Sequence, residues 1–129
     1  MPNYAETGTR PVDGQTFNGL INMQGHPTNN GITALAGGAN SAATPVLAPG
    51  LNRVTVCATN GDSVILPTAA AGTFCMVVNS GAATLKMFAQ TSDTINATAG
   101  ATGLSSLTTG LCALYFAPVN NKWFQLLSA

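Results

Sequence analysis

The strand-and-turn pattern of this chain is clearest in residues 53–67, which have the sequence RVTVCATNGDSVILP. Apolar and polar residues alternate in the first half of this stretch, as in a strand with one buried face. Asn60-Gly61 follows, a dipeptide typical of two-residue turns between strands. A second apolar run then ends at Pro67, because proline lacks the N–H that would continue a ladder of hydrogen bonds. The stretch therefore predicts two short strands joined by a tight turn.

The same pattern extends in both directions from this stretch. Further strand-like runs, each bounded by turn residues, occupy 44–47, 73–79, 83–88, 93–96, 104–108, 111–117 and 122–127. The nearly continuous apolar run 73–79 predicts a central strand that is buried on both faces. Strands at spacings of about 8–12 residues are typical of sandwiches and barrels. We therefore expect an all-β fold without helices, a small β-sandwich or jelly-roll-like domain over residues 44–129.

Residues 1–43 have a different composition. They are rich in Gly, Asn, Thr and Ala, their larger apolar residues are mostly isolated, and no strand or helix period persists. This predicts an extended N-terminal arm over 1–43, with short strands around 16–23 and 30–36, preceding the β domain over 44–129. An arm of this kind would bury single side chains against neighbouring proteins.

Charge is scarce throughout the sequence. Four basic and four acidic residues among 129 give a formal net charge of zero, whereas about a quarter of an ordinary domain is charged. Near-zero net charge favours association between copies. Residues 14–52 carry no charge at all, which predicts that this stretch is covered by other subunits in an assembly.

Few residues are available for chemistry. His26 is the only histidine and lies in the predicted arm, where no nucleophile or further metal ligand accompanies it. Asp62 and Asp93 would have to meet at one end of a sheet to bind a cation, and Asn60-Gly61-Asp62 fits a turn better. We expect no catalytic residue, no cofactor-binding residue, no metal ligand and no cofactor, and a protein that is not an enzyme.

The three cysteines lie inside strand-like runs, at Cys57, Cys75 and Cys112, and no C-x-x-C motif occurs. Free cysteine behaves as a small buried hydrophobe, so we expect reduced thiols in the core. The spacing leaves open one disulfide with one remaining thiol, or a metal-binding or nucleophilic cysteine.

The sequence argues against two kinds of partner, nucleic acid and a membrane. Four well-separated basic residues form no basic stripe for nucleic acid. No apolar run reaches the roughly 18 residues that cross a bilayer, and the N-terminus has no pattern of a secretory signal. We therefore expect no nucleic-acid or membrane partner, and synthesis in a cytoplasm without export.

The order of motifs over residues 61–127 resembles a known family of modules. The motifs are Gly61 to Pro67 (GDSVILP), an Ala-rich link over 68–72, an apolar strand ending in Asn79-Ser80-Gly81, Asp93 to Asn96 (DTIN), and Lys122-Trp123. Similar modules occur in virion proteins of tailed bacteriophages, including capsid decoration (cement) proteins and segments of tail fibres. The resemblance covers about half of the chain and implies no catalytic residues.

Two motif residues have predictable folding roles. Asn79-Ser80-Gly81 predicts a turn that tolerates a positive φ angle. Trp123, the only tryptophan, should close the core with its indole N–H on a backbone carbonyl.

The resemblance and the low charge together favour one function. They imply a capsid decoration protein on the outer surface of the virion, which binds the major capsid protein and itself as a homotrimer and stabilises the head by bridging capsid subunits. The alternative is a tail-fibre or baseplate module that binds a host-surface glycan. An adhesin of non-viral origin stays open as a further alternative.

Overall fold

The computed structural model describes residues 28–129, which form ten β-strands and no helix. This confirms the all-β class that the sequence predicts. The strands are β1 (Thr28–Thr33), β2 (Gly50–Val56), β3 (Ser63–Ile65), β4 (Thr73–Asn79), β5 (Leu85–Phe88), β6 (Thr94–Ile95), β7 (Thr98–Ala99), β8 (Leu104–Leu107), β9 (Cys112–Val119) and β10 (Lys122–Leu127).

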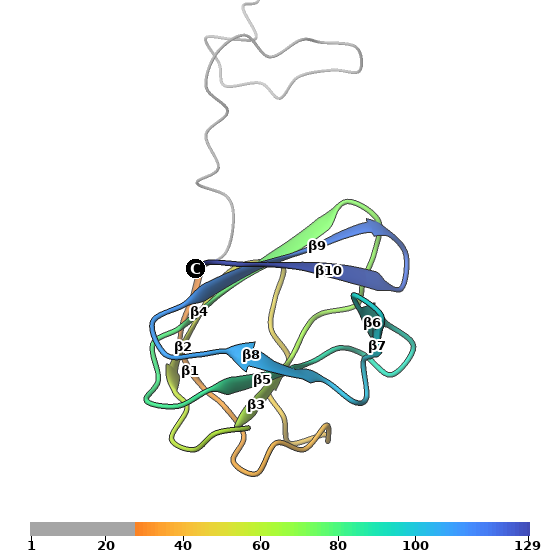
Figure 1. The fold of residues 1–129 in the computed structure, drawn as a ribbon. Helices are drawn as coiled ribbons and strands as arrows, with labels where there is room; N and C mark the ends of the chain where they lie inside the picture. The colour runs from red at the N-terminus through yellow and green to blue at the C-terminus, as the bar shows by residue number, and fades with distance from the viewer. Residues whose placement is uncertain (1–27) are drawn as a thin grey trace, which may run out of the picture.

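The strands form two sheets that face each other across one core. The larger sheet has seven strands in the order β1-β2-β4-β9-β10-β6-β7, and the smaller sheet has three in the order β3-β5-β8. Figure 1 shows β4, β9 and β10 as an upper layer over β3, β5 and β8. The layered arrangement is that of a sandwich-like domain.

The first half of the described chain winds between the two sheets. It passes from β2 in the larger sheet to β3 in the smaller one, then to β4 and β5 in the same alternation. We call one passage of the chain through both sheets, such as β2 followed by β3, a winding. Consecutive windings lie in parallel, β2 beside β4 and β3 beside β5, with Gly50 opposite Cys75 and Ser63 opposite Lys86. A jelly roll is a double-sheet fold of Greek keys with antiparallel strands. The parallel pairs are thus a feature that strand number alone does not predict.

The second half of the chain closes the domain with antiparallel strands. β8 runs against β5, and β9 runs against β4. β9 and β10 form a hairpin whose turn contains Asn121 with a φ of 63°, a conformation that asparagine adopts more readily than most residues. The turn residues 118–121 predicted from the sequence include this hairpin turn.

β1 and the loop after it belong to the packed structure. β1 pairs in parallel with β2 at the edge of the larger sheet, with Thr28 opposite Leu51. Leu35 and Ser63 then exchange two backbone hydrogen bonds of 2.9 Å. Residues 28–43 of the predicted arm are therefore bonded to the domain, and β1 overlaps the strand expected around 30–36. The rest of the predicted arm, residues 1–27 with the strand expected around 16–23, lies outside the described residues.

The core lies between the sheets and is closed by Trp123. Inward side chains alternate along each strand, as Ala113, Tyr115 and Ala117 do along β9. The Trp123 ring is fully buried, and its Nε1 donates to the carbonyl oxygen of Pro67 at 3.2 Å. This confirms the role predicted for the tryptophan.

Buried asparagines link the windings to one another. Asn29 Nδ2 in β1 donates to Asn52 Oδ1 in β2 at 3.2 Å, and Asn52 Nδ2 donates to the Ala48 carbonyl at 2.9 Å. Asn79, at the end of β4, donates from Nδ2 to two carbonyl oxygens, those of Ala83 and Leu107, both at 2.8 Å. Because buried carbonyls need partners, these amides tie the loops at Ala48 and Ala83 and the end of β8 at Leu107 to the strands beside them.

The turn at Asn79-Ser80-Gly81 differs from its prediction. Gly81 does not have a positive φ. A Cβ on Gly81 would instead lie 2.5 Å from both the Cβ and the backbone nitrogen of Cys57. The turn therefore requires glycine for close packing against the preceding winding. Gly61, in the Asn60-Gly61 turn, does have a positive φ of 95°.

Replacement of Asn79 by alanine should strongly destabilise the fold. Asn79→Ala removes both donors to Ala83 and Leu107 and the Oδ1 that accepts from the Gly81 N–H at 3.0 Å. We expect the free energy of unfolding, measured by chemical denaturation, to fall by about 2–4 kcal/mol. The matched control is Asn120→Ala, which removes one exposed bond from the Ala71 N–H and should cost less than about 1 kcal/mol. Equal losses for the two variants would contradict this role.

Candidate interaction surface

The outer surface of the larger sheet is apolar across four adjacent strands. Outward positions on β2, β4, β9 and β10 hold aliphatic and aromatic side chains, although this side of the sheet does not face the core. We call this surface the apolar face. It consists of Leu51, Phe74, Met76, Val78, Leu114, Phe116, Phe124 and Leu126.

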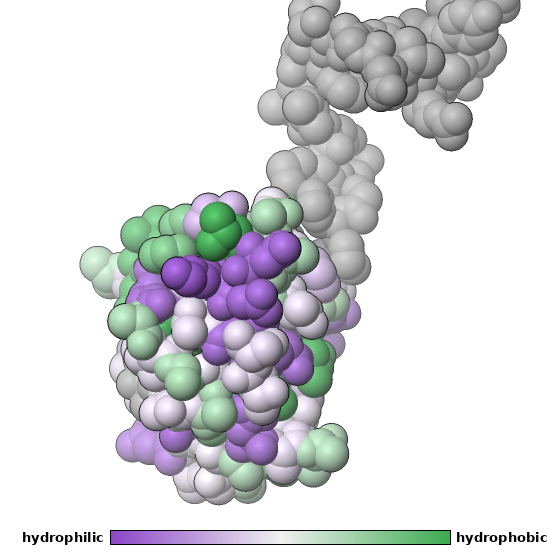
Figure 2. Space-filling view, turned by 90° about the vertical axis from the view of Figure 1, so that its right-hand side faces the viewer, coloured by the Kyte–Doolittle hydropathy of each residue, from purple (hydrophilic) through white to green (hydrophobic). Residues whose placement is uncertain are grey.

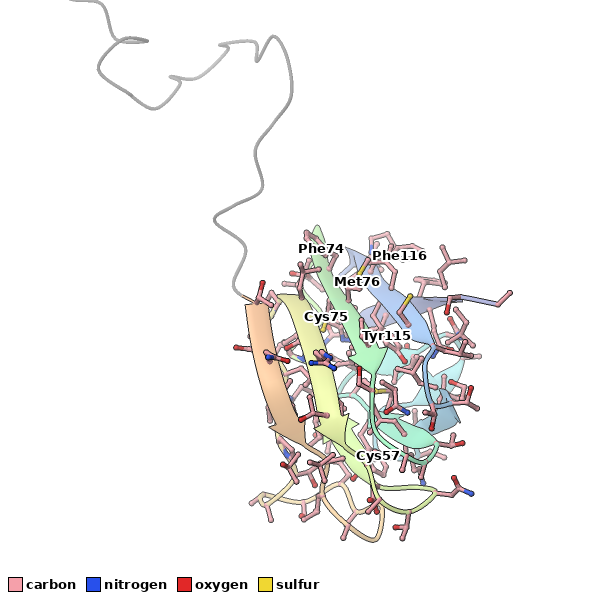
Figure 3. All side chains as sticks on the ribbon, turned by 90° about the vertical axis from the view of Figure 1, so that its left-hand side faces the viewer. Cys57, Phe74, Cys75, Met76, Tyr115 and Phe116 are labelled. Carbon is pink, nitrogen blue, oxygen red and sulfur yellow. The ribbon has the colours of Figure 1, made fainter. Side chains whose placement is uncertain are left out.

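Strand register arranges these side chains in rows. Leu51 pairs with Met76, Met76 with Leu114, and Leu114 with Leu126, so one aliphatic row crosses all four strands. A second row is aromatic and runs from Phe74 through Phe116 to Phe124. Figure 3 shows Phe74 and Met76 on β4 beside Phe116 on the neighbouring β9.

The face is open to solvent in the described structure. Leu126 is 63% exposed, and Leu51, Phe116 and Phe124 are each about 40% exposed. The Phe116 and Phe124 rings stack on each other with centroids 5.9 Å apart. Contiguous apolar patches of this kind on protein surfaces mark interaction sites.

Two hollows lie on either side of Met76. One has a volume of about 230 Å³ and is lined mainly by Thr28, Leu51 and Val78. The other has a volume of about 270 Å³ and is lined mainly by Leu114, Leu126 and Cys112. The apolar face is therefore ridged, with space for side chains of another surface between its rows.

The charged side chain of Arg53 lines one hollow of the apolar face, and the exposed Lys122 lies on β10 two residues before Phe124. Arg53 Nε donates to Ser80 Oγ at 2.9 Å, and Arg53 Nη1 donates to Asn30 Oδ1 at 3.3 Å. Lys86 lies in the smaller sheet, with its Nζ 4.8 Å from the Phe88 ring centroid. Figure 2 shows the side of the molecule that lies to the right in Figure 1. Hydrophilic residues cover the middle of this side, and hydrophobic residues gather towards its top.

This surface was not predicted from the sequence. The expectation that the strand over 73–79 is buried on both faces is wrong, because Phe74, Met76 and Val78 are only partly buried. Phe116 and Phe124 also lie in strand-like apolar runs, yet both are exposed. The apolar run 73–79 did signal two apolar faces, but a run of this kind does not tell whether the second face is covered by the same chain.

The uncharged stretch 14–52 contributes little to the apolar face. Only Leu51 comes from that stretch, and the other seven residues lie between 74 and 126. The predicted covering of residues 14–52 in an assembly stays a prediction. His26, within the stretch, lies outside the described residues.

Asp62 fixes a turn between two windings. Its carboxylate accepts hydrogen bonds from the Thr59 hydroxyl at 2.6 Å, from the N–H groups of Ala58 and Thr59 at 2.8 and 3.0 Å, and from the Gly37 N–H at 3.4 Å. These bonds, led by those from Thr59, hold the pKa of Asp62 below its ordinary value. The predicted turn role of Asn60-Gly61-Asp62 is confirmed.

Asp93 fixes a different turn. It is buried, accepting from the Ala69 N–H at 2.8 Å and from Asn121 Nδ2 at 2.9 Å. Asp62 and Asp93 therefore have separate sets of partners. Within residues 28–129, no group of three or more His, Cys, Asp or Glu side chains could hold a metal ion.

The three thiols are free, and two of them are buried. Burial raises the pKa of Cys75 to about 12, and burial followed by the nearby Asp62 carboxylate raises the pKa of Cys57. Such thiols are poor nucleophiles, because the thiolate is the reactive form. Cys112 departs from the core prediction, because it is partly exposed beside Leu114 on the outer side of β9.

Comparison with known proteins gives no relative for this chain: no family model, no curated protein and no solved structure matches it. Over residues 28–129 there is no helix long and apolar enough to cross a membrane.

The stability of the protein should depend on pH through Asp62. Because the folded-state pKa of Asp62 lies below the ordinary value of about 3.9, its hydrogen bonds stabilise the protein fully above about pH 5. This stabilisation is lost as the pH falls through 4 and below, where the unfolded chain binds a proton more readily. Asp62→Asn should lower the free energy of unfolding at pH 7 and flatten its decline below pH 5. Denaturant titrations of the wild type and Asp62→Asn from pH 3 to 7 measure the free energy of unfolding of each protein. The prediction is refuted when this free energy declines equally with falling pH in both proteins.

Proposed function

We propose that this chain is a structural, non-enzymatic virion protein that stabilises a bacteriophage head as a capsid decoration (cement) protein. It would bind the outer surface of the major capsid protein as a homotrimer and bridge neighbouring capsid subunits. The observation that carries the proposal is the apolar face: an ordered, exposed apolar sheet surface on a chain with eight charges among 129 residues. The motif order over 61–127 supports the same family of roles.

The chemistry of the described residues supports a structural role. The two described carboxylates, Asp62 and Asp93, accept backbone hydrogen bonds that fix turns. Burial raises the pKa of Cys57 and Cys75. The two described carboxylates and the two buried thiols are thus engaged in folding, while the apolar face is exposed.

The distribution of basic residues supports a place on the outside of a capsid. Arg53, Lys86 and Lys122 lie on β2, β5 and β10 respectively and form no stripe along one element. Proteins that bind the packaged genome need clustered cations for the phosphate backbone. An outer position adjoining the capsid protein requires no such cluster.

A protein of this kind would stabilise a head by adding buried area across the joints between subunits. Each 100 Å² of apolar surface removed from water contributes about 2.5 kcal/mol before entropic costs. Symmetry repeats this contribution at every equivalent joint, so a small protein can strengthen a shell under internal pressure.

The proposal is tested on particles produced from the genome that encodes this chain. We expect quantitative mass spectrometry to find the chain in a fixed, symmetry-related ratio to the major capsid protein. Particles from a deletion mutant should lose DNA at a lower temperature than wild-type particles, and added purified protein should restore their tolerance.

Three results would contradict the proposal. They are absence of the chain from the particle, unchanged heat tolerance after deletion, and a few copies confined to the tail. The last result, together with binding of the isolated protein to a glycan array, would favour the tail-fibre or baseplate module.

A further inference from the structure

We propose that the apolar face is where copies of this chain associate with one another, so that its occupant is the apolar face of a second copy. The inference rests only on the self-association in the proposed function and names its contact surface. Because the contact joins two identical faces, it pairs copies about a two-fold axis, and we expect a dimer in place of the homotrimer. The inference requires nothing of the capsid.

The size of the face fits the centre of a subunit interface. Four strands about 4.8 Å apart, crossed by rows about 7 Å apart, cover on the order of 300 Å² in projection. A standard interface buries about 800 Å² of each partner, with an apolar centre and a polar rim. Arg53, Thr55 and Ser128 lie around the apolar rows and would form part of that rim.

Charge argues for an identical partner. The cations nearest the face are Arg53, which already bonds Ser80 and Asn30, and Lys122, which is exposed and lies two residues before Phe124 on β10. No Asp or Glu side chain of the described residues lies on the face, because Asp62 and Asp93 are buried in turns. A positively charged partner would find no complementary side chain there, whereas a copy with no net charge brings little repulsion.

The relief of the face also matches a second copy. Rows of side chains from two sheets interdigitate when the sheets pack face to face about 10 Å apart. Leu126 projects furthest into solvent, and hollows of about 230 and 270 Å³ flank Met76. Another copy would thus present protruding side chains to these hollows and receive the same in return.

The first test is the mass of the full-length protein in solution, measured by sedimentation velocity and native mass spectrometry from 1 to 100 μM. The wild type should form a dimer. Leu126→Lys, at one end of the aliphatic row and the most exposed side chain of the face, should weaken association at least 30-fold, the change expected for one apolar hot-spot residue. Leu51→Lys, at the other end of the same row, serves as a second variant should the first fail to fold.

The matched control is Val46→Lys. Val46 is 58% exposed, close to the 63% of Leu126, but it bridges to Ile65 of the smaller sheet, away from the apolar face. This variant should associate like the wild type, because it adds the same charge to an equally exposed apolar position elsewhere.

Cys112 reports on the same contact. It lines the hollow beside Leu114 and Leu126 and is partly exposed, while Cys57 and Cys75 are buried. A maleimide should therefore modify Cys112 at least ten-fold more slowly in the wild-type oligomer than in monomeric Leu126→Lys. In Val46→Lys the rate should equal that of the wild type.

The inference is overturned by a wild-type protein that stays monomeric at 100 μM or that forms trimers without dimers. It is equally overturned when Val46→Lys dissociates the oligomer as strongly as Leu126→Lys does, or when Cys112 reacts as fast in the oligomer as in the monomer. If the protein self-associates through the apolar face but is absent from virions, the proposed capsid role is refuted while the proposed contact surface is supported.

Discussion

The structure depends on one constraint: parallel strands cannot be joined by a tight turn, so the chain must cross to the other sheet between them. β2, β3, β4 and β5 follow this path, and each crossing closes one side of the core. The crossings bring loops close together, which explains why Gly81 packs against Cys57 without room for a side chain. They also leave loop carbonyls to be paired by side chains, and Asn79 bonds one of these, Ala83, together with the carbonyl of Leu107 at the end of β8.

The same constraint explains why the acidic side chains of the described residues have structural roles. Tight crossings need acceptors for turn N–H groups, and Asp62 and Asp93 supply them. The carboxylates that would make a site reactive are therefore structural. What is left for contact with other molecules is the outer side of the larger sheet, where two rows of apolar side chains follow from strand register.

Much of the fold was predictable from local pattern. Alternation and turn dipeptides predicted the all-β class and most strands, and the large apolar ring of the single tryptophan, Trp123, predicted its place in the core. The parallel windings were not predictable, because Thr28 pairs with Leu51 and Gly50 with Cys75 through contacts more than twenty residues apart. No local sequence signal distinguishes such a pair from a hairpin partner further along the chain.

The sequence by itself determined the class of the fold, the low charge and the scarcity of reactive groups, because these depend on composition and on the two-residue period of a strand. Only the tertiary structure decided which apolar residues are buried. Phe116 and Tyr115 are neighbours with similar side chains, yet one faces solvent and the other the core. The physical reason is that the smaller sheet covers one side of the larger sheet and leaves the other bare.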